Sequence, residues 1–436
     1  MRSPRRRRPL LIAAAVAALA ISACSVESKD DTPSASGGPT AEAYPPPAVP
    51  AVAPGVTADS IKIGFVYPDL DKVKQYIQID HGDYKAAFQA LVDKANSEGG
   101  INGRKIIPVY GAVDVISPTG AQETCVRLTE DEKVFAVLGS LNADEALCYV
   151  QTHKTAVVGG DLTAARYALA QAPWIATLQG GDEIADGLPL LVDRGALTGK
   201  KLAVVSYKDD QALMDTTVLP TLRGRNIAIT ETAVMDADIK DPAAVSSQLN
   251  VFIQKFQSDG VNAVLLIAGA QSQFPAELAK TSYRPQLLFQ SNNQAGAFVF
   301  GASDDDLKVL DGALALGQAV DYTPRDNPCA ATVEAAVPAE RGKIINPADV
   351  PKGQPQIGIS EGIACQTLAL FRAVAQKAGK NLTYQSFQQA AFSLGKINLP
   401  IIVDDATYGR QTPHGDIPPR VMTYDPVKKN FVLAAG

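Results

Sequence analysis

The sequence of 436 residues holds few of the side chains that build catalytic or metal centres. Its three histidines, His81, His153 and His414, lie far apart, so they form no sequence-local zinc motif. A His-Glu-x-x-His motif and a P-loop are absent, and the Gly-Gly pairs starting at Gly99 and Gly159 lack the Gly-x-Gly-x-x-Gly spacing. We interpret His153 as a helix-surface residue rather than a base, and we expect no enzyme, no metal and no cofactor.

Positive charge is also scarce. Forty Lys and Arg residues face 46 Asp and Glu residues, which gives a formal net charge of −6. A nucleic-acid-binding protein needs a cationic face to bind phosphates, so we do not expect a nucleic-acid partner. Hydrophobic residues make up 46% and charged residues 20% of the chain, ordinary values for a globular protein, and the length predicts two or three domains.

The N-terminus has the pattern of an export signal. Five arginines precede an apolar run over residues 10–21, which is too short for a transmembrane helix of about 20 residues. The run ends at Ile21-Ser22-Ala23-Cys24, which resembles a bacterial lipobox. The resemblance implies a signal peptide over residues 1–23 and lipidation of Cys24, on the outer face of the cell membrane. The alternative is an ordinary secretory signal with an incidental cysteine, and the export route stays open.

Residues 24–58 are predicted to form a disordered tether. Residues 25–58 contain seven prolines and almost no large apolar side chains, so they have little surface to bury against the entropy of ordering. Removal of the signal peptide with its five arginines takes the net charge from −6 to −11. Anionic headgroups would therefore not attract the body, and anchoring would depend on the lipid chains.

Four cysteines remain once Cys24 is assigned to lipid, and an exported protein meets an oxidising compartment. Four cysteines allow three pairings. We favour Cys125 with Cys148 and Cys329 with Cys365, because each pair closes a short local loop. Free buried thiols are the alternative.

The body from residue 59 alternates strand and helix patterns. Strands are expected at 61–67, 105–110, 134–139 and 155–159, and helices at 83–97, 119–129 and 143–152. The alternation restarts at residues 201–207 and continues to 287–289. Continuous apolar strands separated by amphipathic helices predict an α/β fold of two doubly wound parallel-sheet lobes with a cleft between them.

One segment carries a resemblance to a known family. Residues 98–105, Glu-Gly-Gly-Ile-Asn-Gly-Arg-Lys, follow the first expected strand and helix. This string resembles the opening of the type I periplasmic binding proteins of the branched-chain amino acid ABC transporter class. Residues 134–140, 259–264 and 361–379 resemble further family segments in the same order. Together the resemblance covers nearly all of residues 59–436.

The resemblance implies a chain that crosses three times between two lobes. Lobe one would take residues 59–182 and 315–395, and lobe two residues 183–314 and 396–436. It also implies a monomeric, lipid-anchored substrate-binding protein that closes on a small polar solute, an amino acid or a related compound, and then docks on an ABC permease with its ATPase. The alternative is a sensing or assembly lipoprotein of the same fold that signals without transport.

Ligands of open α/β sheets bind beyond the carboxyl ends of the strands. The loops there supply the candidate contacts, which are Tyr67, Asp69, Ser140, Leu141, Asn142, Gly160, Asp161, Thr163, Tyr207, Asp209, Gln271, Asn292 and Asn293.

The expected roles of these residues follow the two charged ends of an amino acid. Ser140 and Asn142 open a helix and suit a carboxylate, although ordinary N-capping is the alternative. An acid usual in the family is replaced at 291–293 by Ser-Asn-Asn, so Asp69, Asp161 or Asp209 is a candidate for the ammonium group. Tyr67 and Tyr207 are expected to stack on or cover the ligand.

Overall fold

A computed structural model describes residues 44–434, apart from residues 75–79, 118, 143, 178–182, 239–240, 323–326, 347–348 and 352–353. The expected signal peptide, the lipidated Cys24 and residues 25–43 of the tether lie outside the described residues. No helix in this described part is both long and apolar enough to cross a membrane.

The first sheet has five strands, and every neighbouring pair is parallel. In spatial order they are β2 (Lys105–Val113), β1 (Ser60–Pro68), β3 (Ala136–Gly139), β4 (Ala156–Gly159) and β5 (Trp174–Ile175). Alternate side chains enter two apolar clusters on opposite faces. Phe65 and Leu138 belong to one cluster, and Val66 and Val137 to the other.

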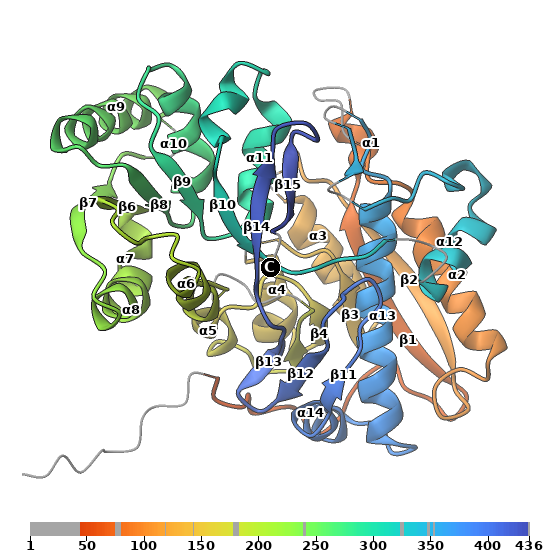
Figure 1. Cartoon of the computed structure of the whole chain (residues 1–436). Helices are drawn as coiled ribbons and strands as arrows, with labels where there is room; N and C mark the ends of the chain where they lie inside the picture. The colour runs from red at the N-terminus through yellow and green to blue at the C-terminus, as the bar shows by residue number, and fades with distance from the viewer. Residues whose placement is uncertain are drawn as a thin grey trace, which may run out of the picture. The chain divides into compact units, whose positions relative to one another are not determined.

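Helices cover both faces of this sheet. The cluster with Phe65 includes side chains of α2 (Tyr84–Ser97), α13 (Gly358–Ala378) and α14 (Tyr384–Phe392), and Figure 1 shows α2 and α13 beside the sheet. The opposite cluster is built from α3 (Gly120–Val126), the π-helical turns η1 (Arg127–Asp131) and η2 (Cys148–Thr152), α4 (Glu145–Leu147) and α5 (Ala164–Tyr167). Shorter elements are α1 (Leu70–Val73), α12 (Pro328–Ala336) and the 3₁₀ turn η6 (Pro338–Glu340).

The second sheet has seven strands. In spatial order they are β15 (Asn430–Leu433), β14 (Arg420–Asp425), β10 (Leu314–Gly317), β9 (Gln286–Phe289), β8 (Ala263–Leu266), β6 (Leu202–Tyr207) and β7 (Ile229–Met235). The pairs from β10 to β7 are parallel, and β14 and β15 add an antiparallel edge. The predicted α/β class with two doubly wound parallel sheets is confirmed.

Helices again lie on both faces of the second sheet. One face packs against α9 (Pro242–Asp259), α10 (Ala270–Ala279), α11 (Asn292–Gly301) and the 3₁₀ turn η5 (Asp306–Leu310). The other packs against α6 (Glu183–Asp193), the π-helical turn η4 (Met214–Val218) and α8 (Leu219–Gly224). Between β6 and η4 lie the 3₁₀ turn η3 (Lys208–Asp210) and α7 (Gln211–Leu213).

Two lobe boundaries drawn from the resemblance differ from the observed sheets. β10 belongs to the second sheet, so that boundary falls after residue 317 rather than before 315. A third, three-stranded sheet of β11 (Gly395–Ile397), β12 (Ala406–Gly409) and β13 (Thr412–Asp416) packs on the first core rather than the second. The Tyr408 hydroxyl donates to the carbonyl of Ala176 over 2.7 Å, which ties this sheet to the end of β5.

The tether prediction is wrong for residues 44–58, because this segment packs on the first lobe. Tyr44 is only 5% exposed, and its ring lies 5.6 Å from that of Tyr167 and 5.1 Å from that of His414. The Tyr44 backbone also exchanges two hydrogen bonds with the Gln411 side chain. At the far end of the segment, Gly55 accepts from the amide of Lys62 at 2.8 Å.

The family-like turn has a clear physical basis. Gly100 has φ +70°, and a Cβ there would lie 2.0 Å from the carbonyl oxygen of Arg104, so only glycine fits. Asn102 in the same turn donates to the carbonyl of Ala375, which joins the turn to the end of α13. Each of the two expected cysteine pairs forms a disulfide, Cys125 with Cys148 and Cys329 with Cys365.

Candidate functional site

The candidate residues of the first sheet follow three adjacent strands. Val66, Gly139 and Gly159 are paired in register near the ends of β1, β3 and β4. The three loops after them therefore meet at one edge. The backbones of β1 and β3 lie close together here, because a Cβ on Gly139 would lie 2.1 Å from the carbonyl oxygen of Val66. The amide of Ser140 also donates to that carbonyl, at 3.0 Å.

The loop after β3 is used largely for packing. Leu141 is 4% exposed and belongs to an apolar cluster of the first lobe. The amide of Asn142 donates to the Glu145 carboxylate at 2.8 Å, so it is already satisfied within the chain. The side chain of Ser140 is half-buried and stays a candidate for ligand contact.

The loop after β4 is held by an arginine. Gly160, with φ +78°, leads into Asp161. The Asp161 carboxylate accepts from Arg166 Nη1 at 2.6 Å, and Arg166 Nε donates to Asp144 at 2.7 Å. Thr163 caps α5 by accepting from the amide of Arg166. A ligand ammonium at Asp161 would therefore compete with a guanidinium.

The loops of the second sheet are also partly satisfied. Gln271 is 1% exposed and joins two loops, since it accepts from the amide of Ser291 at 2.8 Å and donates to the carbonyl of Ala268 at 3.1 Å. The Tyr207 hydroxyl donates to the Gln273 side chain. Asp209 lies exposed in η3.

The remaining candidates are at the start of α11. The Asn292 side chain lies so close to Gly317 that a Cβ on that glycine would approach within 2.5 Å of its Oδ1. The side chain of Asn293 lies outside the described residues.

Two candidate residues, Tyr67 and Asp69, line a cavity of about 390 Å³ at the carboxyl end of β1. The rings of Tyr67 and Tyr84 stack with their centroids 5.7 Å apart and their planes within 6°. Burial raises the pKa of the Tyr67 hydroxyl, and the nearby Asp83 and Asp69 carboxylates raise that pKa further. Burial also raises the pKa of the Tyr84 hydroxyl, so both phenols are neutral near pH 7, and their rings form an aromatic wall.

Charged side chains of both signs complete this cavity. The acids are Asp69, Asp71, Asp80, Asp83 and Glu340, and the bases are Lys74, Lys85 and Lys343. Glu340 is 6% exposed, and its Oε1 accepts from the amide of Asp83 at 2.6 Å. Its Oε2 is buried without a hydrogen-bond partner anywhere in the described chain.

Glu340 and Lys343 are functional candidates that sequence reasoning missed. Both belong to the proline-rich stretch 321–356, which has no periodic pattern to indicate its place in the fold. The stretch is placed at the cavity by long-range hydrogen bonds. The amide of Gln356 donates to the carbonyl of Asp80 at 2.8 Å, and the amide of Ser360 donates to the carbonyl of His81 at 2.9 Å.

One string in the sequence matches a catalytic motif, although the sequence led us to expect no enzyme. Residues 358–362 read Gly-Ile-Ser-Glu-Gly, the Gly-x-Ser-x-Gly pattern of serine hydrolases. In those enzymes the serine is exposed on a strand-to-helix turn, whereas Ser360 lies inside α13 and is fully buried. The hydroxyl of Ser360 donates to the carbonyl of Ile357, and a substrate has no access to it.

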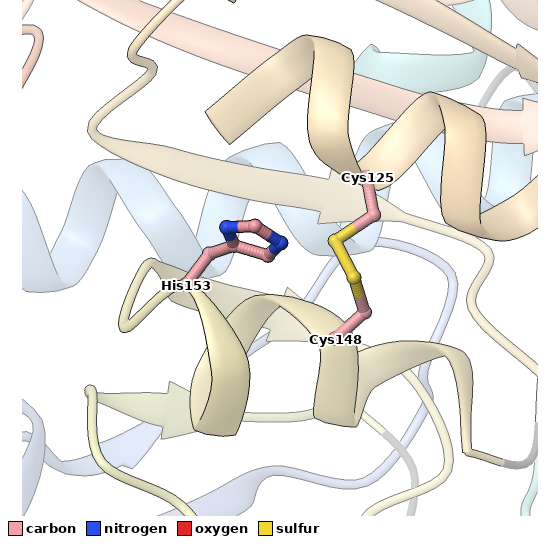
Figure 2. A group of neighbouring side chains, drawn as sticks. All are labelled: Cys125, Cys148 and His153. Atoms are coloured by element: carbon pink, nitrogen blue, oxygen red, sulfur yellow. A yellow bond between two sulfur atoms is a disulfide. The ribbon is translucent and has the colours of Figure 1, made fainter. Parts of the chain in front are cut away.

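One cluster has the composition of a metal site. Figure 2 shows His153 beside Cys125 and Cys148, and their potential ligand atoms lie within 4.8 Å of one another. The two sulfurs are joined in a disulfide, so neither is a thiolate ligand in this state. His153 Nδ1 pairs with the Glu130 carboxylate at 2.7 Å, which gives the histidine a structural role.

Comparison with known proteins supports the fold. No protein-family model and no curated protein matches the sequence. Among solved structures, a periplasmic binding protein type 1 from Bordetella pertussis superposes with a TM-score of 0.60 at 15% identity, over 86% of this chain and all of the other. An ABC transporter substrate-binding protein from Desulfitobacterium hafniense, in complex with Leu, gives 0.58 at 14% identity over the same shares.

A fatty acid ABC transporter substrate-binding protein from Thermomonospora curvata gives a TM-score of 0.54 at 17% identity, over 88% of this chain and 93% of the other. Two further structural neighbours are described as a putative branched-chain amino acid ABC transporter and a possible leucine/isoleucine/valine-binding protein. Identities this low establish architecture and not ligand. The chain has the fold of the type I periplasmic binding proteins.

Proposed function

We infer that the protein is the extracytoplasmic substrate-binding protein of an ABC importer and that it binds a small polar solute, an amino acid or a related compound. The observation that carries this proposal is the cavity at the carboxyl end of β1. It combines an aromatic wall with a buried carboxylate oxygen of Glu340 that has no partner in the described chain. A ligand donor there would satisfy a group whose isolation costs free energy.

The crossing segments supply a hinge for closure on the solute. The amide of Asp321 donates to the carbonyl of Ile401 at 2.8 Å, and the amide of Val403 donates to Ala319 at 3.0 Å. These pairs bring together the chain leaving β10 and the loop between β11 and β12. The cavity at β1 is lined by the first lobe alone, so a solute bound there would favour the closed state only by also contacting loops of the second lobe. Loop residues Ser140, Asp161, Tyr207 and the others predicted above stay candidates for these contacts.

Lipidation of Cys24 would hold the protein at the outer face of the membrane. Because Tyr44 is packed on the body, 19 residues separate it from Cys24, fewer than the 34 expected from composition alone. Such a leash raises the effective concentration of the body near a permease.

Calorimetric screening tests the proposal. The mature chain carrying Cys24→Ser is titrated with amino acids, amides, short peptides and other polar solutes, and at least one is expected to bind with micromolar affinity. Asp161→Ala then tests the loop after β4. A loss of at least tenfold, about 1.4 kcal/mol, would place Asp161 at the solute, and unchanged affinity would remove it. If no small solute binds, the transport function is contradicted.

A further inference from the structure

A second cavity, of about 510 Å³, lies on the first lobe and shares no lining residue with the first. α2, α12, α13 and the crossing loop at residues 400–403 form its walls. Its volume falls within the range of about 300–1,000 Å³ that small-molecule sites occupy. The Cys329–Cys365 disulfide lines it and links α12 to α13.

Most of the lining is apolar. Leu91, Leu368, Ile401 and Ile402 line the cavity and are each at most 7% exposed. Val403 at the margin is 56% exposed, which is unusual for a large aliphatic side chain. Such walls suit the hydrocarbon body of a ligand, because each buried methylene contributes about 0.8 kcal/mol.

Two N–H groups of lining residues have no acceptor among the residues that the structure describes. Asn327 is 6% exposed, and its Oδ1 caps α12 by accepting from the amides of Cys329 and Ala330 at 3.0 and 3.3 Å. Its Nδ2 is buried without a hydrogen-bond partner in the described chain, and so is Nε of Arg372. The other end of that guanidinium donates to Glu98 through Nη2 at 3.2 Å.

The unpartnered groups, rather than the net charge, favour an acceptor ligand. The lining holds two bases, Lys94 and Arg372, and two acids, Glu98 and Asp321, so its formal charges balance. Glu98 is shared between Arg372 and Lys94, which lies 2.9 Å from its Oε1, so this carboxylate is already compensated by two cations. The unpartnered groups are both donors, and one belongs to a permanent cation. A donor ligand such as an amine would leave both of them unsatisfied, whereas a carboxylate offers two acceptor oxygens.

We propose that this cavity is a second binding site, for a small monocarboxylate with an apolar body, whose carboxylate accepts from Asn327 Nδ2 and Arg372 Nε. The hydrocarbon part of the ligand lies against Leu91, Leu368 and Ile401. The site is separate from the solute cavity at β1, so this proposal does not depend on the proposed import function.

Calorimetry on the mature chain with hexanoate, hexanamide and hexylamine tests the chemistry. Hexanoate is expected to bind at least tenfold more tightly than the other two, because only it brings a charge-assisted acceptor. Equal affinity for hexanoate and hexylamine, or no hexanoate binding at millimolar concentration, would overturn the proposal.

Two substitutions separate the ligand contacts from folding. Asn327→Asp retains the capping oxygen, since Asp and Asn cap helices equally well, but it replaces the donor with an acceptor. Arg372→Lys retains the charge and removes Nε. Each is expected to weaken hexanoate binding at least tenfold, and cooperative thermal unfolding of each variant shows that it is folded. The matched control Asn381→Asp, at an exposed position, is expected to leave the affinity unchanged.

Location is tested by photolabelling. A diazirine analogue of hexanoate is expected to label peptides from residues 365–372 or 398–403, and Glu340→Gln at the other cavity is expected to leave the labelling intact. Labelling confined to other peptides, or unchanged hexanoate affinity in both Asn327→Asp and Arg372→Lys, would refute the site.

Discussion

The packing of Tyr44 predicts a measurable effect of its removal. The side chain is 5% exposed and contacts the rings of Tyr167 and His414. Burial of a side chain of this size contributes about 1.5–3 kcal/mol, and each aromatic contact adds about 0.5–1.5 kcal/mol. Tyr44→Ala should therefore destabilise the docked state of residues 44–58 by about 3 kcal/mol.

Proteolysis under native conditions measures this docking. When opening is fast relative to cleavage, the cleavage rate follows the population of the open form, so about 3 kcal/mol corresponds to cleavage on the order of 100-fold faster. Proteinase K digestion followed by mass spectrometry detects cuts between residues 44 and 58. Val52→Ala is the matched control, because Val52 is 81% exposed. Equal cleavage of Tyr44→Ala, Val52→Ala and the parent protein would refute the docking of this segment.

Two further predictions concern the core and the first turn. Burial raises the pKa of Glu361 to about 8, so the native state keeps a proton that the unfolded state releases above its own pKa near 4.5. The contribution of Glu361 to the free energy of unfolding is therefore fully present below pH 4.5 and is lost as the pH rises to 8. In urea unfolding, the free energy of unfolding of Glu361→Gln should depend less on pH over this window than that of the parent protein. An identical profile in the variant would show that Glu361 does not titrate there. Gly100→Ala should lower the free energy of unfolding by about 2 kcal/mol or more, because at φ +70° the new Cβ meets the carbonyl oxygen of Arg104. Gly296→Ala is the control: its Cβ would lie in open space on α11, so this change should be neutral or mildly stabilising. Equal effects of the two changes in urea unfolding would contradict the steric explanation of the turn.

Periodic patterns of apolar residues predicted most of the fold. The apolar run predicted at 61–67 is β1, and the helical spacing predicted over 83–97 is α2, because both elements bury their own side chains against a sheet core. Gly100 indicated the turn from the sequence alone, because its backbone conformation suits glycine and no other residue. These features depend on neighbours close in sequence, so local reasoning finds them.

Features that depend on distant partners were not predictable in the same way. Prolines around Tyr44 indicated a solvated tether, yet the partners of Tyr44 are more than 120 residues away in the sequence. Glu340 lies in a stretch without periodicity, and only the fold brings it to Asp83. Leu141 and Gln271 were expected at the ligand, but the structure buries one in an apolar cluster and joins the other to Ser291.

The cavity lined by Tyr67 and Glu340 is the proposed site of the polar solute. Calorimetry of the best solute from the screen, with the mature chain and with Glu340→Gln, tests this assignment. We expect the solute affinity to be at least tenfold weaker in Glu340→Gln. Glu334→Gln, on neighbouring α12, is the matched control and should bind the solute as tightly as the parent protein. Unchanged solute affinity in Glu340→Gln would contradict the assignment of this cavity as the binding site.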